Sequence, residues 1–147
     1  MTVVKGETTP LQTEADIVRV RQVVRQWALQ QGFSLVEQTK MVTATSELAR
    51  NTVIHGGGGT AQLEALTSGN RRGLRVIFVD QGPGIPDNEK KNIFQQFYRI
   101  GNEQTRSAKG TGLGLHLCKK IAADHNGKIY VKDNHPKGSN FIIRFRR

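Results

Sequence analysis

The sequence is short of cysteine and of long apolar runs, and both shortages exclude classes of protein. Its one cysteine, Cys118, cannot form an internal disulfide, and its place in an apolar helical pattern predicts a core residue rather than a nucleophile. No apolar run approaches the roughly 20 residues that a membrane-spanning helix needs. Residues 1–10 also lack the basic and apolar regions of a signal peptide, so we expect a cytoplasmic protein with no membrane partner.

Acidic residues are also few. The chain has 22 Lys and Arg against 12 Asp and Glu, a net charge of +10, which favours anionic partners such as nucleotide phosphates, nucleic acid or an acidic protein surface. The basic residues are spread along the chain, and no RNA-binding aromatic signature or recognition-helix motif accompanies them. A solvated basic surface is the simpler interpretation, and a nucleic-acid partner is not favoured.

The hydrophobic pattern of the 147 residues predicts a single α+β domain, with helices on one face of a mixed sheet and residues 1–13 as an N-terminal strand or arm. Two helices are expected early, one from Asp16 to Gly32 with Trp27 on its core face, and one from the N-cap Ser34, where Glu37 completes a capping box. The second helix is expected to carry Val36 in its apolar pattern and to end at the glycine run 56–59. The nearly continuous apolar run 74–79 predicts a strand inside the sheet. The remaining elements are an edge strand over 3–7 before a turn at 9–10, strands over 61–66 and 74–79, a rigid loop over 81–86, a short helical segment over 88–97, a polar loop over 101–109, a helix to about 125, and a hairpin of 128–132 with 139–145.

Three glycines, Gly110, Gly112 and Gly114, stand at every second position directly before an apolar helical pattern. Glycine lets a ligand approach the main chain closely, and the N–H groups that begin a helix attract phosphate. The same spacing also suits a simple tight turn. It is neither a dinucleotide fingerprint, because no strand runs into it, nor a P-loop, because the lysine-serine/threonine ending is absent.

Glu47 and Asn51 are four residues apart in the second helix, so they project from one face. An amide oxygen can ligate Mg²⁺, and a carboxylate can orient or deprotonate an attacking hydroxyl or water. An ordinary polar helix face is the alternative interpretation.

Asp80 ends an apolar strand and precedes Gly82 and Gly84. A buried carboxylate needs hydrogen-bond donors, and the exocyclic amine of a base is one such donor, with the glycines allowing a flat ring to approach the backbone. The alternative is an aspartate that stabilises a turn.

Taken in order, residues 47–51, 80–86, 94–98 and 110–115 resemble the four nucleotide boxes of the GHKL ATPase superfamily. This superfamily includes sensor histidine kinases, anti-sigma-factor serine kinases, gyrase-type ATPases and a class of heat-shock chaperones. The resemblance covers residues 14–147. It implies the Bergerat fold, a two-layer α/β sandwich that binds ATP between its helical layer and a flexible lid.

The resemblance also implies roles for individual residues. Asn51 is expected to hold Mg²⁺, Asp80 to bind the adenine amine, and Ser139 to stand where the family commonly has a threonine near adenine. The glycines of the last box are expected to form the hinge of the lid. Arg99, Arg106 and Lys109 are candidate phosphate contacts, with solvated loop charge as the alternative. The nucleotide-binding residues implied in full are Asn51, Asp80, Gly82, Gly84, Ile85, Arg99, Lys109, Gly110, Thr111, Gly112, Leu113, Gly114, Leu115 and Ser139.

The two halves of the chain resemble different branches of the superfamily. Residues 13–59 are similar to the switch serine kinases of anti-sigma pathways, whereas residues 93–115 resemble histidine kinases. None of the four histidines follows a two-helix segment that could present it as a phosphoacceptor. We therefore expect a serine/threonine kinase that uses ATP and Mg²⁺, with Glu47 as base, to phosphorylate an antagonist protein. A sigma factor or phosphatase is a further possible partner, and a homodimer is possible. The alternatives are a histidine-kinase catalytic domain and a nucleotide-dependent binding module.

Overall fold

The computed structural model describes residues 1–96 and 114–147. Within these ranges five strands form one sheet in the order β1-β2-β3-β5-β4. The elements, in chain order, are β1 (Thr2–Leu11), α1 (Glu14–Gln30), α2 (Leu35–Ile54), β2 (Gly59–Ser68), β3 (Arg71–Asp80), α3 (Asp87–Lys90), α4 (Gly114–Asp124), β4 (Lys128–Asp133) and β5 (Ser139–Arg146).

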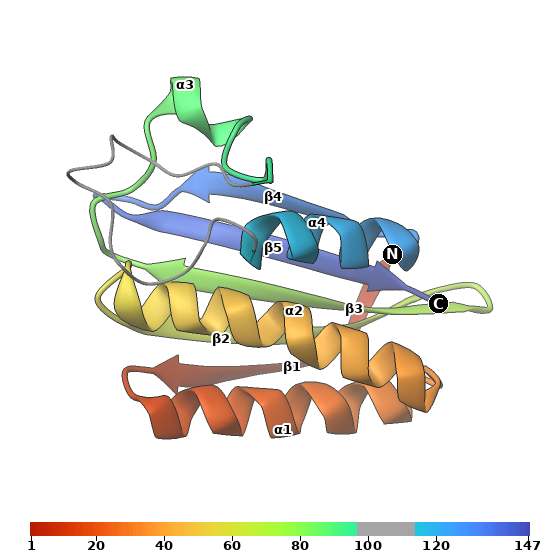
Figure 1. The fold of residues 1–147 in the computed structure, drawn as a ribbon. Coiled ribbons are helices and arrows are strands. Elements are labelled where there is room, and N and C mark those ends of the chain that lie inside the picture. The colour runs from red at the N-terminus through yellow and green to blue at the C-terminus, as the bar shows by residue number, and fades with distance from the viewer. Residues whose placement is uncertain (97–113) are drawn as a thin grey trace.

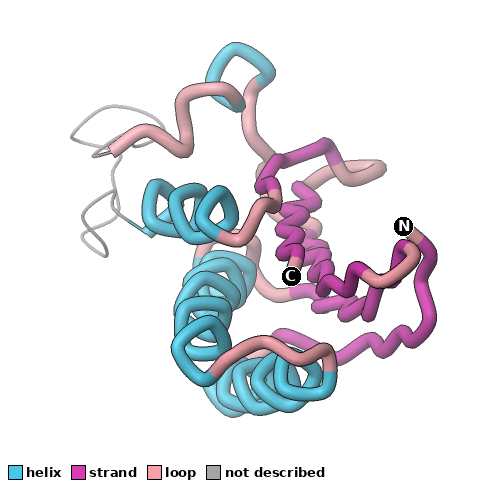
Figure 2. The backbone as a smooth tube through the Cα atoms, turned by 90° about the vertical axis from the view of Figure 1, so that its right-hand side faces the viewer, coloured by secondary structure: helices cyan, strands magenta, loops and turns pink. Residues whose placement is uncertain are grey.

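The helices α1, α2 and α4 lie side by side on one face of the sheet (Figures 1 and 2). This arrangement confirms the predicted α+β class. The expected mixed sheet is wrong, because all four strand pairings are antiparallel. Short turns join β2 to β3 and β4 to β5, and α4 leads to the edge strand β4 rather than directly to the neighbour of β3. The adjacent strands β1 and β2 are joined through two helices, α1 and α2, so the chain enters β2 antiparallel to β1.

The core lies between the helices and the alternating inward side chains of the sheet. In the central strand β3, Leu74, Val76 and Phe78 are buried in the core cluster, whereas Ile77 and Val79 face the other side and are partly exposed. Each fully buried side chain of this size contributes about 1.5–3 kcal/mol to folding. Trp27 and Cys118 are buried in the same cluster, as predicted.

Capping boxes fix the starts of both long helices. Ser34 and Glu37 form the predicted box on α2, with the Ser34 N–H donating to Glu37 Oε1 at 2.8 Å. A second box, formed by Thr13 and Asp16, begins α1 two residues earlier than expected. Hydrogen bonds from backbone N–H groups, of Gln12 for Asp16 and of Ser34 for Glu37, are the main cause that lowers the pKa of each carboxyl.

Three sequence predictions about elements are wrong in detail. The first strand extends to Leu11, so Pro10 lies in a strand rather than a turn, which an edge strand tolerates because one side needs no ladder hydrogen bond. Val36 is 65% exposed and lies outside the core stripe of α2. The segment after Pro86 forms only the single turn α3.

No helix in residues 1–96 and 114–147 is long and apolar enough to cross a bilayer.

Candidate nucleotide site

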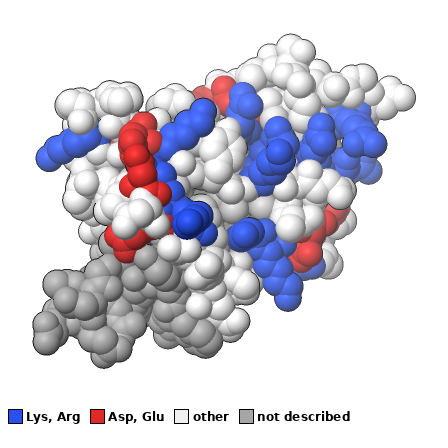
Figure 3. All heavy atoms as spheres, turned by 90° about the horizontal axis from the view of Figure 1, so that it is seen from above, with Lys and Arg blue, Asp and Glu red and all other residues white. Residues whose placement is uncertain are grey.

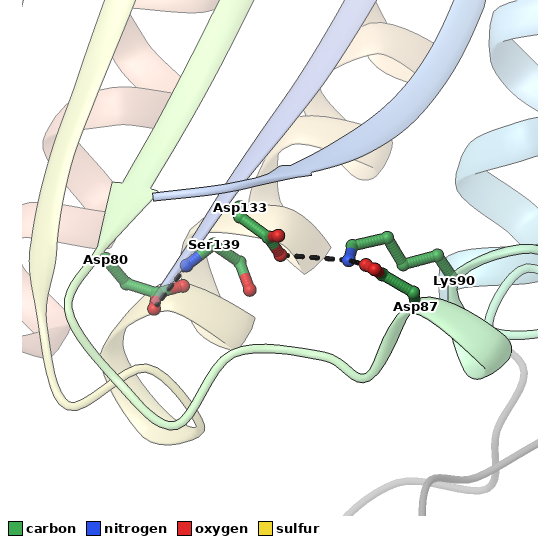
Figure 4. A network of polar contacts seen from close by, with 5 residues as sticks. All are labelled: Asp80, Asp87, Lys90, Asp133 and Ser139. Atoms are coloured by element: carbon green, nitrogen blue, oxygen red, sulfur yellow. Dashed lines mark hydrogen bonds and ion pairs between the residues drawn. The ribbon is translucent and has the colours of Figure 1, made fainter. Parts of the chain in front are cut away.

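Asp80 lies at the end of β3 and is only 4% exposed. Its Oδ1 accepts hydrogen bonds from the backbone N–H of Gly82 at 2.9 Å and of Ser139 at 3.2 Å (Figure 4). Within the described residues, Oδ2 accepts no hydrogen bond. One oxygen therefore fixes the carboxylate to the backbone, and the other is left to accept a hydrogen bond from a ligand.

Glycines pack directly against Asp80. A Cβ at Gly56 would lie 2.5 Å from the Asp80 Cβ, and a Cβ at Gly82 would lie 2.9 Å from the Gly56 Cα. A Cβ at Gly138, whose φ is +101°, would collide with the Asp80 carbonyl oxygen. Only glycine fits these three positions without displacing the Asp80 side chain or the backbone around it.

The loop after Asp80 lies against the turn between β4 and β5. Gly84 has a φ of +76°, and a Cβ there would lie 3.3 Å from the Gly138 carbonyl oxygen. Asn134 Nδ2 donates to the Asp80 carbonyl oxygen at 2.7 Å, and Ile85 packs against the core. The loop predicted from its glycines and prolines is thus held by contacts at both ends.

Sequence analysis did not assign Gly56, Gly138 or Asn134 to the site. Their contacts with Asp80 join residues that are far apart in the chain, 54 positions in the case of Asn134. The only sequence signal was the run of glycines after the second helix, which was interpreted as a helix end.

Glu47 and Asn51 lie on α2, and both are half-buried. A Cβ at Gly114 would lie 2.7 Å from Glu47 Oε2, so the Glu47 carboxylate is directly beside the first residue of α4. Its Oε1 is 3.6 Å from the Arg50 Nη1. The structure therefore places Glu47 of the first predicted box beside Gly114 of the last one.

Asn51 connects this pair of helices to the Asp80 loop. Its carbonyl oxygen accepts the N–H of His55 at 2.9 Å and of Gly56 at 3.1 Å, which places the glycine that supports Asp80 directly after the helix. The Asn51 side chain makes no hydrogen bond with the described residues. Its amide oxygen is therefore available as a ligand.

Several predicted residues lie outside the described part of the chain: Arg99, Arg106, Lys109, Gly110, Thr111, Gly112 and Leu113. Gly114 and Leu115 begin α4, and Leu115 packs against the core. Ser139 is buried and contributes its N–H to Asp80.

An ion-pair network holds α3 against the end of β4. Lys90 Nζ contacts the carboxylates of Asp87 and, at 2.9 Å, of Asp133, which joins α3 to the end of β4 (Figure 4). The hydrogen bond to Asp87, followed by that to Asp133, raises the pKa of Lys90. Nothing in the sequence pattern indicated this network.

Cys118 has no chemical role in this arrangement. Its Sγ donates to the Ala44 carbonyl oxygen at 3.3 Å, and burial, with a smaller effect of the Glu47 charge, raises the pKa of the thiol to about 12. A thiol of this kind is unreactive, because the thiolate is the nucleophile.

The residues suit a purine nucleotide with a bound magnesium ion. The free oxygen of Asp80 matches the exocyclic amine of a base. Within residues 1–96 and 114–147, no group of three or more His, Cys, Asp or Glu side chains could hold a metal ion. A magnesium ion at Asn51 would be held by the side-chain amide oxygen, with phosphate oxygens and waters as its other ligands.

Comparison with known proteins finds relatives in both branches of the superfamily that the sequence resembles. The family model of histidine kinase-, DNA gyrase B- and HSP90-like ATPases matches residues 36–147. The serine/threonine-protein kinase RsbT of Bacillus subtilis is 45% identical over 111 residues, which cover 76% of this chain and 77% of RsbT. The sensor protein CiaH of Streptococcus pneumoniae is 41% identical over 83 residues, which cover 56% of this chain but only 19% of CiaH.

A solved structure shows the same fold. The mycobacterial sensor histidine kinase MprB aligns with a TM-score of 0.60 over 95% of this chain and 97% of that chain, at 19% sequence identity. At this identity the similarity concerns the fold alone. Together with the matched family model, it confirms the resemblance first seen in the four boxes, and the chain belongs to the family of histidine kinase-, DNA gyrase B- and HSP90-like ATPases.

Proposed function

We propose that this chain, as a single domain over residues 1–147, is an ATP-dependent serine/threonine protein kinase of the partner-switching type that phosphorylates an antagonist protein. The observation that carries the proposal is the position of Glu47, whose carboxylate lies beside the start of α4 and one helical turn from Asn51. The relative RsbT, a serine/threonine kinase by name, supports a hydroxyl as the phosphate acceptor.

The residues of the Asp80 loop recognise the base. Asp80 Oδ2 accepts a hydrogen bond from the adenine amine, while Oδ1 remains bound to the N–H groups of Gly82 and Ser139. Gly82, Gly84 and Ile85 form the wall against which the ring lies. This part of the site selects a nucleotide with an amino group, because an unpaired buried carboxylate rejects a base that lacks the donor.

The residues of α2 act at the phosphates. Asn51 holds Mg²⁺ through its amide oxygen, and the ion, when bound, offsets negative charge on the phosphates. Glu47 accepts the proton of the substrate hydroxyl as that oxygen attacks the γ-phosphorus of ATP and ADP leaves. Arg99, Lys109 and the glycines 110, 112 and 114 supply further phosphate contacts.

A histidine-kinase catalytic domain is the second candidate, favoured by the 41% identity with CiaH. A binding module that uses ATP only to regulate a partner, such as a sigma factor or phosphatase, is the third. A homodimer is compatible with each of these functions.

The test uses ATP labelled on its γ-phosphate, Mg²⁺, the purified chain and the protein encoded beside its gene. We expect label on that protein as acid-stable phosphoserine or phosphothreonine. Acid-labile label would overturn this proposal in favour of the histidine kinase. Binding of ATP with no transfer to any such protein would favour the binding module.

A further inference from the structure

The face of the sheet opposite the helices is basic. Because side chains alternate along a strand, the residues between the core positions of β3, β4 and β5 point away from the helices. We call this surface the open face. Its cations on the three strands include Arg75, Lys128, Lys132, Arg144 and Arg146, and one carboxylate, Glu64 of β2, lies among them.

The strand register sets these charges in a row. Glu64 pairs with Arg75, Arg75 with Arg144, and Arg144 with Lys128, so four charged residues cross the sheet in one line. Arg75 Nε is 2.6 Å from Glu64 Oε1, which leaves the other two cations of the row without a carboxylate among the described residues. Figure 3 looks onto the side of the molecule where α3 and the edge strand β4 lie, and it shows Lys and Arg side chains across this side with Asp and Glu side chains beside them.

Polar atoms on β5 are buried here without partners. Arg144 Nε, Arg146 Nε and Asn140 Oδ1 are enclosed but make no hydrogen bond with the described residues. Buried polar groups in folded proteins are nearly always paired, and a missing partner costs free energy. A planar guanidinium is suited to a carboxylate, which can bind two of its N–H groups at once.

Apolar and aromatic side chains lie among the cations of this face. Ile142 is almost fully buried there, although it lies outside the core cluster, and the neighbouring Tyr130 is 40% exposed, with Lys132 Nζ 5.6 Å from its ring centroid. Arginine and tyrosine around apolar side chains are typical of protein interfaces.

We propose that the open face binds the acidic surface of a partner protein, whose Asp and Glu side chains pair with Arg144, Arg146 and Lys128. Asp80 and Ser139 belong to the opposite, helix-covered side of the sheet, since they share the alternation of Phe78 and Phe141. A partner on the open face therefore leaves the candidate nucleotide site uncovered. The inference does not depend on phosphate transfer and concerns a second surface.

The test compares two charge-reversal variants of equal net charge. Lys128→Glu with Arg144→Glu changes the open face, and Arg21→Glu with Lys40→Glu changes exposed positions of α1 and α2; each pair lowers the net charge by four, from +10 to +6. The probe is a fluorescent 20-residue peptide rich in Asp and Glu, with oligo-dT and phosphatidylglycerol vesicles as competing probes. ATP affinity and circular dichroism establish that each variant is folded.

We expect the open-face variant to bind the peptide about tenfold or more weakly than the original chain, and the control variant to lose less than about twofold. Amide chemical shifts of the ¹⁵N-labelled chain should change on β3, β4 and β5. Equal losses in both variants, or shift changes confined to the Asp80 loop, would overturn the proposal. Tighter binding of oligo-dT or of vesicles would do so as well, and would assign the surface to nucleic acid or to a membrane. If the reversal variant does not fold, Lys128→Gln with Lys132→Gln replaces it, with Arg21→Gln and Lys40→Gln as its control.

Discussion

The two parts of the candidate nucleotide site hold their side chains in different ways. Asp80 is buried, accepts two backbone N–H groups and rests against glycines. Glu47 and Asn51 project from α2, and their side chains make no hydrogen bond with the described residues; the Glu47 carboxylate lies beside the start of α4 and 3.6 Å from Arg50 in an ion pair. The backbone therefore prepares the Asp80 part before a ligand arrives, whereas the α2 part has side chains that remain available for phosphates and the reacting hydroxyl.

The largest effect expected from this comparison is on catalysis alone. Glu47→Gln should lower the rate of phosphate transfer by about 10²–10⁴-fold, because the amide cannot accept the proton of the hydroxyl. ATP affinity should change by less than about twofold. Single-turnover transfer and calorimetric ATP titration measure the two quantities, and Glu14→Gln on the exposed start of α1 is the control. Undiminished transfer would contradict the assignment of the base.

A change at Asp80 should act on binding instead. Asp80→Asn keeps the size of the side chain but puts an amide NH₂ where one carboxylate oxygen was, and this group cannot accept the adenine amine. We expect ATP to bind about 100-fold or more weakly. Asp124→Asn, an equal loss of charge at the exposed end of α4, should leave the affinity unchanged. If Asp80→Asn binds ATP normally, the adenine assignment is wrong.

The glycines beside Asp80 offer a smaller and steric test. Gly56→Ala puts a methyl group 2.5 Å from the Asp80 Cβ, which forces the carboxylate to move. We expect a loss of about 1–3 kcal/mol in unfolding free energy and, by displacement of Asp80, ATP binding roughly tenfold weaker. Gly6→Ala is the matched control, because the nearest atom to a Cβ there is 3.8 Å away. Equal behaviour of the two variants would show that the close packing at Gly56 does not position Asp80.

The smallest expected effect is on the stability of the fold, through the capping box at the start of α2, away from both parts of the site. The pKa of Glu37 is lowered from its model-compound value of 4.5 by the capping hydrogen bonds, the largest from the Ser34 N–H. A carboxyl with a lower pKa in the folded state stabilises the fold above the unfolded pKa, and this contribution is lost as the pH falls through the folded pKa. The original chain should therefore lose stability as the pH falls below about 4.5, and Glu37→Gln should lose less, by about 1 kcal/mol or less. Thermal unfolding at a series of pH values measures the difference. A pH profile identical to that of the original chain would contradict it.

Local signals predicted much of this molecule. The helix starting at Ser34, the central position of β3 and the burial of Trp27 and Cys118 follow from spacing along the chain, and the structure confirms them. The roles of Glu47, Asn51 and Asp80 were inferred from their order along the chain and remain predictions.

Long-range packing accounts for what the sequence did not predict. Gly138 and Asn134 reach Asp80 only because the last hairpin folds back beside β3. The antiparallel pairing of β3 with β5 likewise depends on where α4 delivers the chain, which no local pattern encodes.

The insertion of β5 between β3 and β4 has a consequence for the order of events during synthesis. Asp80 leaves the ribosome early, but the N–H of Ser139 that fixes its carboxylate comes 59 residues later. A nascent chain that ends in the loop after β3 has the aspartate with only the Gly82 donor of its two backbone donors. Because a ligand stabilises only the state that binds it, ATP could not stabilise the growing chain through a finished Asp80 contact until the last strand has entered the sheet.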